Sequence, residues 1–232
     1  MKQLDFLEKP NIRVERPKKT GGYRNRYHLE EKFNCLLREE LHLANLVSYV
    51  GNKSVPILRL YRYKEAFALK FVEEIISRFG LRERDYIFDP FCGMGTTMFA
   101  ASKKGIPSIG VDKLPIAVFV SKTLPLFYSL RPGKIKENFE QLRTKYQQAT
   151  PSSTALDVGI MKVAFPSDTL LSLRKWKTVI DDLGSPIRDV FLILFFSILE
   201  SCSFTSKDGQ FLRLVREKKV PSPEEAIGRK VF

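Results

Sequence analysis

Apolar residues recur along the chain with two different spacings, and these spacings predict where its helices and strands lie. Steps of three and four residues, typical of a helix with one buried face, run through residues 29–50, 66–79, 115–124, 168–183 and 187–200. Another helix is expected from four apolar side chains spaced in the same way: Ile135, Phe139, Leu142 and Tyr146. Helices are therefore expected before and after a short section in which the pattern changes.

That section contains two short runs of strand character, residues 86–88 and residues 107–111. The first run leads into a turn with two glycines, residues 89–97, and then into a short apolar helix, residues 98–104. The second run ends on Asp112. The order is strand, glycine turn, helix, strand and terminal aspartate.

This order is typical of a unit that binds a nucleoside. A helix N-terminus offers unpaired backbone N–H groups, and Gly93 and Gly95 let a ligand approach the main chain. Asp112 follows the glycines by about twenty residues, the spacing at which such units place the acid that binds the ribose hydroxyls. An isolated pair of glycines would indicate only a turn, whereas the whole order favours a bound nucleoside.

The residues around the glycines indicate which nucleoside. A P-loop for nucleoside triphosphates needs a lysine after its last glycine, where this chain has Thr96, and a dinucleotide-binding turn needs a glycine or alanine where it has Met98. Asp89, at the end of the first strand, places a carboxylate where the ammonium group of an amino-acid-bearing nucleoside could pair with it. These features favour S-adenosylmethionine.

Residues 89–97, Asp-Pro-Phe-Cys-Gly-Met-Gly-Thr-Thr, resemble the cofactor motif of amino-methylating DNA methyltransferases, Asp-Pro-Phe-x-Gly-x-Gly-Thr. Residues 52–53 and 62–67 are similar to the segment just upstream of that motif in the cytosine-N4 enzymes, and residues 203–213 to a segment downstream of it. The likeness covers roughly residues 45–215. Some tRNA guanine methyltransferases share the motif, but the flanking segments favour DNA.

The resemblance implies an α/β fold with an incomplete, Rossmann-like class I methyltransferase sheet and with N-terminal and inserted helices. S-adenosylmethionine is the implied cofactor; Asp89 would face its ammonium group, Asp112 would hold the ribose hydroxyls, and Phe67 would touch the methionine end. The implied cofactor-binding residues are Asp89, Pro90, Phe91, Gly93, Gly95, Thr96, Thr97, Asp112 and Phe67. No metal role is expected, since the two histidines and three cysteines lack the spacing of metal ligands.

Charge and composition indicate a nucleic-acid partner and four sections. The 39 basic and 26 acidic residues give a net charge of +13, which favours an anionic partner such as DNA. Residues 1–28 are expected to be a basic, flexible arm that either follows DNA phosphates or is a solvated tail, and the two are compatible. Residues 29–130 would form the cofactor-binding core, residues 131–215 a helical insertion with a turn segment, and residues 216–232 a loosely ordered tail.

Membrane association is not expected from this sequence. The first thirty residues show no signal peptide, and the longest apolar run, residues 190–199, is too short to cross a bilayer. We expect a cytoplasmic protein.

The residues that would present the methyl acceptor are missing from the sequence. Methylating an exocyclic amino group of DNA requires a flipped base stacked on an aromatic ring, which the resembled family provides with Ser-Pro-Pro-Tyr or Asp-Pro-Pro-Tyr. The 13 prolines include no adjacent pair, so no catalytic residue is assigned. Because the Pro-Pro-Tyr motif follows the downstream segment in the family, we expect either one subunit of a split enzyme, completed by a second polypeptide, or a truncated form.

Three functions stay open at this point. The first is the S-adenosylmethionine-binding part of a restriction-modification DNA methyltransferase, with cytosine-N4 favoured over adenine-N6. The others are a non-catalytic nucleic-acid-binding module and a fragment of an RNA methyltransferase. The target DNA sequence and the oligomeric state are not encoded in any recognisable residue.

Overall fold

The computed structural model describes residues 24–36, 39–61, 63–152, 159–208 and 211–232. The chain divides into two compact units, residues 1–42 and residues 43–232. In unit 1 the described elements are α1 (Arg24–Phe33) and the short 3-10 helix η2 (Asn34–Leu36), and the 3-10 helix η3 (Leu41–Leu46) begins at its end. Most of the expected basic arm, residues 1–23, lies outside the described residues.

The continuous helix expected over residues 29–50 does not form. α1 ends at Phe33 and is followed by separate 3-10 helices, of which η4 (Tyr49–Ser54) is the last in this section. Leu36 and Leu41, on which the expectation rested, are 76% and 74% exposed. Without a buried apolar face, tertiary packing supplies nothing to hold a long helix together.

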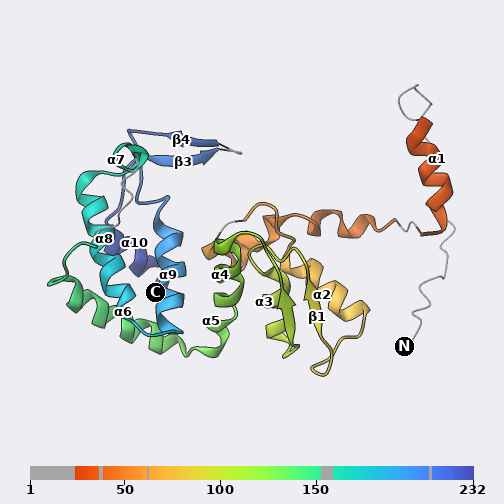
Figure 1. Ribbon diagram of the computed structural model, residues 1–232, viewed down its shortest axis with the longest axis horizontal. Coiled ribbons are helices and arrows are strands. Elements are labelled where there is room, and N and C mark those ends of the chain that lie inside the picture. Colours follow the sequence, from red (N-terminus) through yellow and green to blue (C-terminus); the bar gives the residue numbers. More distant parts are fainter. Residues whose placement is uncertain (1–23, 37–38, 62, 153–158, 209–210) are drawn as a thin grey trace. The chain divides into compact units, whose positions relative to one another are not determined.

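The first half of unit 2 alternates helices with two strands (Figure 1). After η4 its elements are η5 (Leu58–Leu60), α2 (Leu69–Arg78), β1 (Ile87–Asp89), α3 (Thr96–Lys103), β2 (Ser108–Gly110), α4 (Pro115–Thr123) and α5 (Leu126–Ser129). β1 and β2 pair in parallel, with Ile87 opposite Ser108 and Asp89 opposite Gly110. The apolar patterns therefore predicted both strands and α2, α3 and α4 to within a few residues.

The second half of unit 2 is mainly helical. It contains α6 (Pro132–Tyr146), α7 (Gly159–Ala164), α8 (Ser167–Asp181), α9 (Ile187–Ile198), the antiparallel strands β3 (Thr205–Asp208) and β4 (Phe211–Leu214), and α10 (Pro223–Val231). The loosely ordered tail expected over residues 216–232 is instead largely the helix α10, whose Ala226 and Ile227 are buried. Ser222 caps this helix by accepting a hydrogen bond from the Glu225 N–H, and Pro223 occupies its first turn, both of which favour a helix start.

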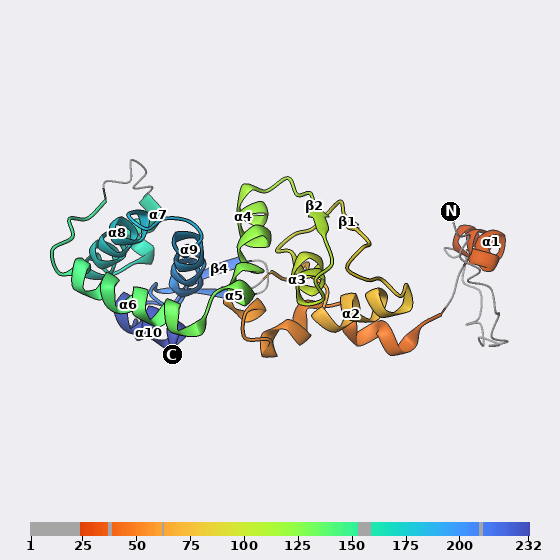
Figure 2. The ribbon, with the colours of Figure 1, turned by 90° about the horizontal axis from the view of Figure 1, so that it is seen from below.

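The two halves of unit 2 share one hydrophobic core. α4 lies between α3 on one side and α9 on the other in both views (Figures 1 and 2). Phe119 of α4 meets Phe196 of α9 edge to face, with ring centroids 5.9 Å apart. Farther along, Trp176 is fully buried and stacks on Phe139 and Tyr146 of α6. The helical half therefore packs against the half that carries the parallel sheet of β1 and β2.

The fold is a mixed α/β arrangement with a small parallel sheet and many helices. Among the described residues, none of the helices is both long and apolar enough to cross a membrane.

Candidate functional site

The glycine turn connects the end of β1 to the start of α3 and is fastened to β2. The Val111 N–H donates to the Asp89 carbonyl at 2.9 Å, and the Cys92 N–H donates to the Val111 carbonyl at 3.0 Å. The first N–H that pairs within α3 is that of Phe99, which donates to the Gly95 carbonyl at 2.8 Å. The N–H groups of the preceding turn have no partner inside the helix, as at any helix N-terminus.

Two glycines of the turn have left-handed backbone angles and lie close against neighbouring residues. Gly93 has φ +51° and Gly95 has φ +85°. A Cβ on Gly95 would lie 2.6 Å from the Cα of Ser121 in α4, and a Cβ on Gly93 would lie 3.0 Å from the ring of Tyr63. The glycines therefore let the turn pack closely on its neighbours.

Asp89 binds groups of the turn itself. Its Oδ1 accepts a hydrogen bond from the Phe91 N–H at 3.0 Å, and its Oδ2 accepts one from the Thr97 hydroxyl at 2.6 Å. These two bonds fix the start of the turn to the first turn of α3. Each carboxylate oxygen keeps a second lone pair, so Asp89 retains the capacity to accept from a ligand.

Asp112 joins the turn to the end of β2. Its Oδ2 accepts from the Gly93 N–H at 3.0 Å, and its Oδ1 accepts from the Leu114 N–H at 2.8 Å. The structure thus brings together Asp112 and the glycines, 19 residues apart in sequence. As with Asp89, one acceptor position on each oxygen remains for a ligand.

The other predicted residues of the turn differ in their exposure. Phe91 is 87% exposed, whereas Thr96 is 3% exposed. The Thr96 hydroxyl is buried, and among the described residues it has no hydrogen-bond partner. Pro90 follows Asp89 directly in the chain, and the Thr97 hydroxyl donates to the Asp89 carboxylate. Pro90 and Thr97 therefore both lie next to Asp89, where the turn begins.

Phe67 lies just before α2, outside the hydrogen bonds that close the turn. Its side chain is 45% exposed and its ring packs at a tilt on Phe71, with centroids 5.2 Å apart. Its carbonyl accepts a hydrogen bond from the Asn52 amide at 2.7 Å. Asn52, which is 3% exposed, also accepts from the Leu69 N–H at 2.8 Å. Asn52 therefore fixes the entry into α2.

Sequence reasoning assigned no role to three residues of this region, which are Tyr63, Asn52 and Gly110. Tyr63 lies against Gly93, and together with Met94 and Asn52 it lines a small hollow of about 10 Å³. Burial raises the pKa of Tyr63, and the nearby Asp112 carboxylate adds to the increase, so its phenol is neutral and able to donate. The third is Gly110, where a Cβ would lie 2.8 Å from both the Cβ of Cys92 and the sulfur of Met98. No local pattern marks the role of Gly110, whereas Tyr63 and Asn52 both stand in the upstream segment noted above.

Cys92 is placed to pack rather than to react. Its side chain is buried, and this burial raises the pKa of the thiol, an increase that Ser121 partly offsets and to which Asp112 and Asp89 add. A neutral thiol is a poor nucleophile. Among the described residues, there is also no group of three or more histidine, cysteine, aspartate and glutamate side chains that could hold a metal ion.

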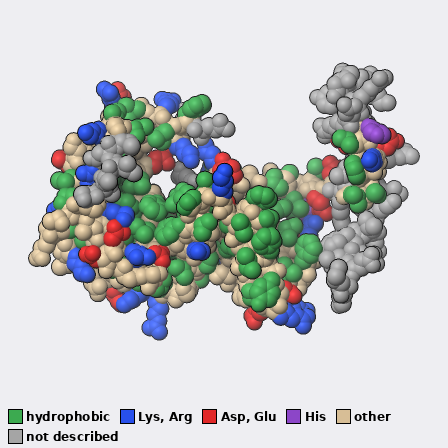
Figure 3. All heavy atoms as spheres, viewed as in Figure 1, with side chains coloured by type: hydrophobic (Ala, Val, Ile, Leu, Met, Phe, Trp, Pro, Cys, Tyr) green, Lys and Arg blue, Asp and Glu red, His purple; other side chains and the backbone are tan. Residues whose placement is uncertain are grey.

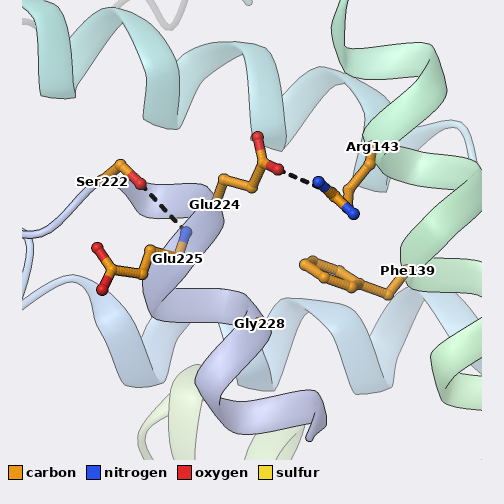
Figure 4. A pocket seen from close by; sticks show the side chains of 6 residues that line it. All are labelled: Phe139, Arg143, Ser222, Glu224, Glu225 and Gly228. Carbon is orange, nitrogen blue, oxygen red and sulfur yellow. Dashed lines mark hydrogen bonds and ion pairs between the residues drawn. The ribbon is translucent and has the colours of Figure 1, made fainter.

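A larger hollow, of about 270 Å³, lies between α6 and α10 and contains none of the predicted residues (Figure 4). Glu224 points toward Arg143, with Oε1 2.7 Å from Nε, and the Phe139 ring faces α10 near Gly228. A Cβ on Gly228 would make an ordinary contact with that ring at 3.5 Å. The ion pair is partly exposed, so it adds little stability, and this hollow is a packing groove between two helices.

Comparisons with known proteins agree with the geometry of the turn. A family model described as DNA methylase, of the N6/N4 methyltransferase type, matches residues 5–121. The type II methyltransferase M.BsoBI of Geobacillus stearothermophilus is 36% identical over 196 residues, which make up 81% of this chain. The type II methyltransferase M.AvaI of Nostoc sp. is 30% identical over 191 residues, or 80% of this chain, and M.AvaI of Anabaena variabilis matches equally well. No solved structure gives a significant match.

These matches cover 37% of M.BsoBI and 39% of M.AvaI. The chain therefore spans less than half the length of these relatives.

Proposed function

The chain belongs to the DNA methylase family, and from this premise we propose that its residues 89–112 bind S-adenosylmethionine for the methylation of an exocyclic amino group of DNA. The observation that carries the proposal is the closed glycine turn. Asp89 and Asp112 hold it from both sides, and its backbone N–H groups lie at the N-terminus of α3. The sheet would be the start of a Rossmann-like class I methyltransferase sheet.

The residues present fit this cofactor. S-adenosylmethionine supplies an activated methyl group on a sulfonium, and its ammonium and ribose hydroxyls are hydrogen-bond donors. Asp89 and Asp112 offer acceptors at the two ends of the turn. The hydroxyl of Thr96, buried without a partner among the described residues, lies in the same turn.

The roles of single residues follow from their places. Asp89, whose Oδ2 already accepts from Thr97, would pair with the ammonium group, and Asp112 would accept from the ribose hydroxyls. Phe91, 87% exposed, would offer an aromatic surface to the ligand. Phe67 would approach the methionine end, held in place through its bond to Asn52. Pro90, Gly93, Gly95, Thr96 and Thr97 would shape the turn.

The acceptor side of the reaction is proposed to come from sequence that this chain lacks. No two of its prolines are adjacent, so the Pro-Pro-aromatic element of the resembled family is absent from these 232 residues. We therefore favour a chain that works with a second polypeptide carrying that element, or else a truncated form. Cytosine-N4 is favoured over adenine-N6 because the flanking segments resemble those of the cytosine-N4 enzymes.

Calorimetric titration with S-adenosylmethionine tests the proposal. The wild-type chain should bind the cofactor, and Asp112→Asn should weaken binding by about 1–3 kcal/mol because one carboxylate acceptor becomes an amide donor. Asp182→Asn, which changes an exposed aspartate at the end of α8, is the matched control and should bind as the wild type does. Absence of binding, both by the chain alone and with partner polypeptides present, would refute the proposal.

A further inference from the structure

The small parallel sheet leaves one of its faces uncovered. α3 packs against β1 and β2, and Ile87 points to that side, into the core. Because side chains alternate along a strand and β1 and β2 are paired in register, four apolar side chains share the opposite side. These four form what we call the open face, and more than half of each is exposed: Tyr86 74%, Phe88 64%, Ile109 57% and Val111 52%.

One edge of β1 is also without a neighbouring strand. The Ile87 N–H and the Asp89 carbonyl bond toward β2. In a parallel ladder alternate residues bond to opposite sides, so the N–H and carbonyl of Phe88 point away from β2. Among the described strands, none pairs with that edge.

A two-stranded parallel sheet with only one covered face is unusual. Two strands alone are marginal in water, and parallel sheets are normally covered on both faces. Hydrophobic side chains gather on the visible side of the molecule over the region of α3 and β1 (Figure 3). Contiguous apolar surface with an unpaired strand edge is typical of an interaction site.

Building on the proposed function, we infer that the open face and the free edge of β1 dock a polypeptide carrying the portion of a methylase that this chain does not match. More than half of M.BsoBI and of M.AvaI lies outside the matched regions, so the relatives contain enough sequence to extend the sheet and cover it. The docked segment would run parallel to β1, with apolar side chains on the side of Phe88 and Ile109.

This docking has a consequence for the chemistry of the site. The carboxyl ends of parallel strands meet at one edge of a sheet, and β1 ends at Asp89, where the glycine turn begins. A parallel strand added beside β1 would therefore end next to that turn. Residues that follow such a strand would therefore lie beside the proposed cofactor site. That is where the residues that present the methyl-accepting base are needed.

Co-purification tests the inference with the full 232-residue chain. It is co-expressed with a separate, tagged polypeptide that contains the part of M.BsoBI outside its 196 matched residues. We expect a stoichiometric complex and slower amide hydrogen exchange in residues 86–91 and 108–111 of this chain. Ile109→Asp should weaken association at least about tenfold, because it buries a charge in the interface.

The matched control is Ile160→Asp, which changes an isoleucine of α7 that is 64% exposed. It should leave association within about twofold of the wild type, as expected for a surface site outside an interface. Tyr86→Asp is a second variant of the open face, and its agreement with Ile109→Asp would show that misfolding of one variant does not explain the loss.

Several results would overturn the inference. They are the absence of a complex, equal weakening by Ile109→Asp and Ile160→Asp, and protection of the open face in the chain alone. Protection that disappears on deletion of residues 2–23 would assign the face to the chain's own N-terminal segment, and protection that disappears on dilution would assign it to a second copy. Titration with S-adenosylmethionine in the same samples separates the two proposals, since cofactor binding without a complex refutes the docking alone.

Discussion

At the scale of single residues, two aspartates close the glycine turn. Asp112 accepts from the Gly93 and Leu114 N–H groups, and Asp89 accepts from Phe91 and Thr97. Hydrogen bonds to a charged acceptor are stronger than neutral ones. The two residues expected to hold the cofactor are therefore also structural residues of the turn.

Replacing Asp112 should consequently lower stability as well as cofactor binding. Asp112→Ala leaves the Gly93 and Leu114 N–H groups without their acceptor, and we expect the free energy of unfolding to fall by about 1–3 kcal/mol. Urea denaturation followed by circular dichroism measures this change. Asp182→Ala, at an exposed position, should change the free energy of unfolding by less than about 0.5 kcal/mol. An equal loss in both variants would contradict a stabilising role for the two hydrogen bonds that Asp112 accepts.

Cys92 gives stability a dependence on alkaline pH. Because burial raises the pKa of its thiol in the folded chain, the unfolded chain loses this proton first as the pH rises. Stability due to Cys92 is therefore complete below the ordinary thiol pKa of about 8.5 and falls as the pH rises from there toward the raised folded value.

Cys92→Ala should make this alkaline decline shallower, and Cys35→Ala, at an exposed thiol, should leave it unchanged. Denaturant titrations from pH 7 to pH 10 measure the slope. Cys202 is also buried and its thiol pKa is also raised, so Cys202→Ala serves as a positive control and should make the decline shallower as well. Identical slopes for the Cys92→Ala variant and the wild type would contradict the assignment.

At the scale of elements, Gly95 controls how closely α3 and α4 approach. A side chain there would meet the backbone of Ser121, and the residue has φ +85°, which non-glycine residues adopt at a cost of about 1–3 kcal/mol. Gly95→Ala should therefore destabilise unit 2 by more than about 2 kcal/mol, since strain and steric overlap both contribute.

Gly133→Ala is the opposite case in the same chain. Gly133 lies in α6, and a Cβ there would have nothing within 4 Å. This change should raise stability by up to about 1 kcal/mol through helix propensity. Thermal unfolding of both variants measures the contrast, and equal shifts would show that the turn is looser than its contacts indicate.

The elements also show how far the sequence predicts the structure. Local sequence patterns were sufficient to predict β1, β2, α2, α3 and α4. In each of them a regular spacing of apolar residues begins or ends near a glycine or a proline. The long helix expected over residues 29–50 failed because apolar spacing does not tell whether a face finds a partner, and Leu36 and Leu41 remain exposed. The same limit applies to Tyr63 and Gly110, whose roles arise from contacts with residues distant in sequence.

At the scale of the whole chain, charge adds to the family evidence. Lys and Arg side chains are scattered over the side seen in Figure 3 rather than gathered in one stripe. A net charge of +13 favours contacts with the phosphates, which carry no sequence information directly.

The chain should accordingly bind duplex DNA with little sequence specificity, and its affinity should depend strongly on the salt concentration. We expect affinity to fall by at least about tenfold between 50 and 200 mM salt, because counterions are released from the phosphates on binding. Fluorescence anisotropy with two unrelated duplexes measures both properties. Affinity that is indifferent to salt would contradict a contact carried by the basic residues.

Hydrogen exchange with and without saturating S-adenosylmethionine tests the central claim most directly, because it locates the ligand as well as detecting it. We predict slower exchange in peptides that cover residues 89–97 and 108–114, and unchanged exchange in peptides from α6 and from α10. Unchanged exchange throughout residues 89–114, under conditions in which binding is saturated, would contradict a cofactor held by the glycine turn.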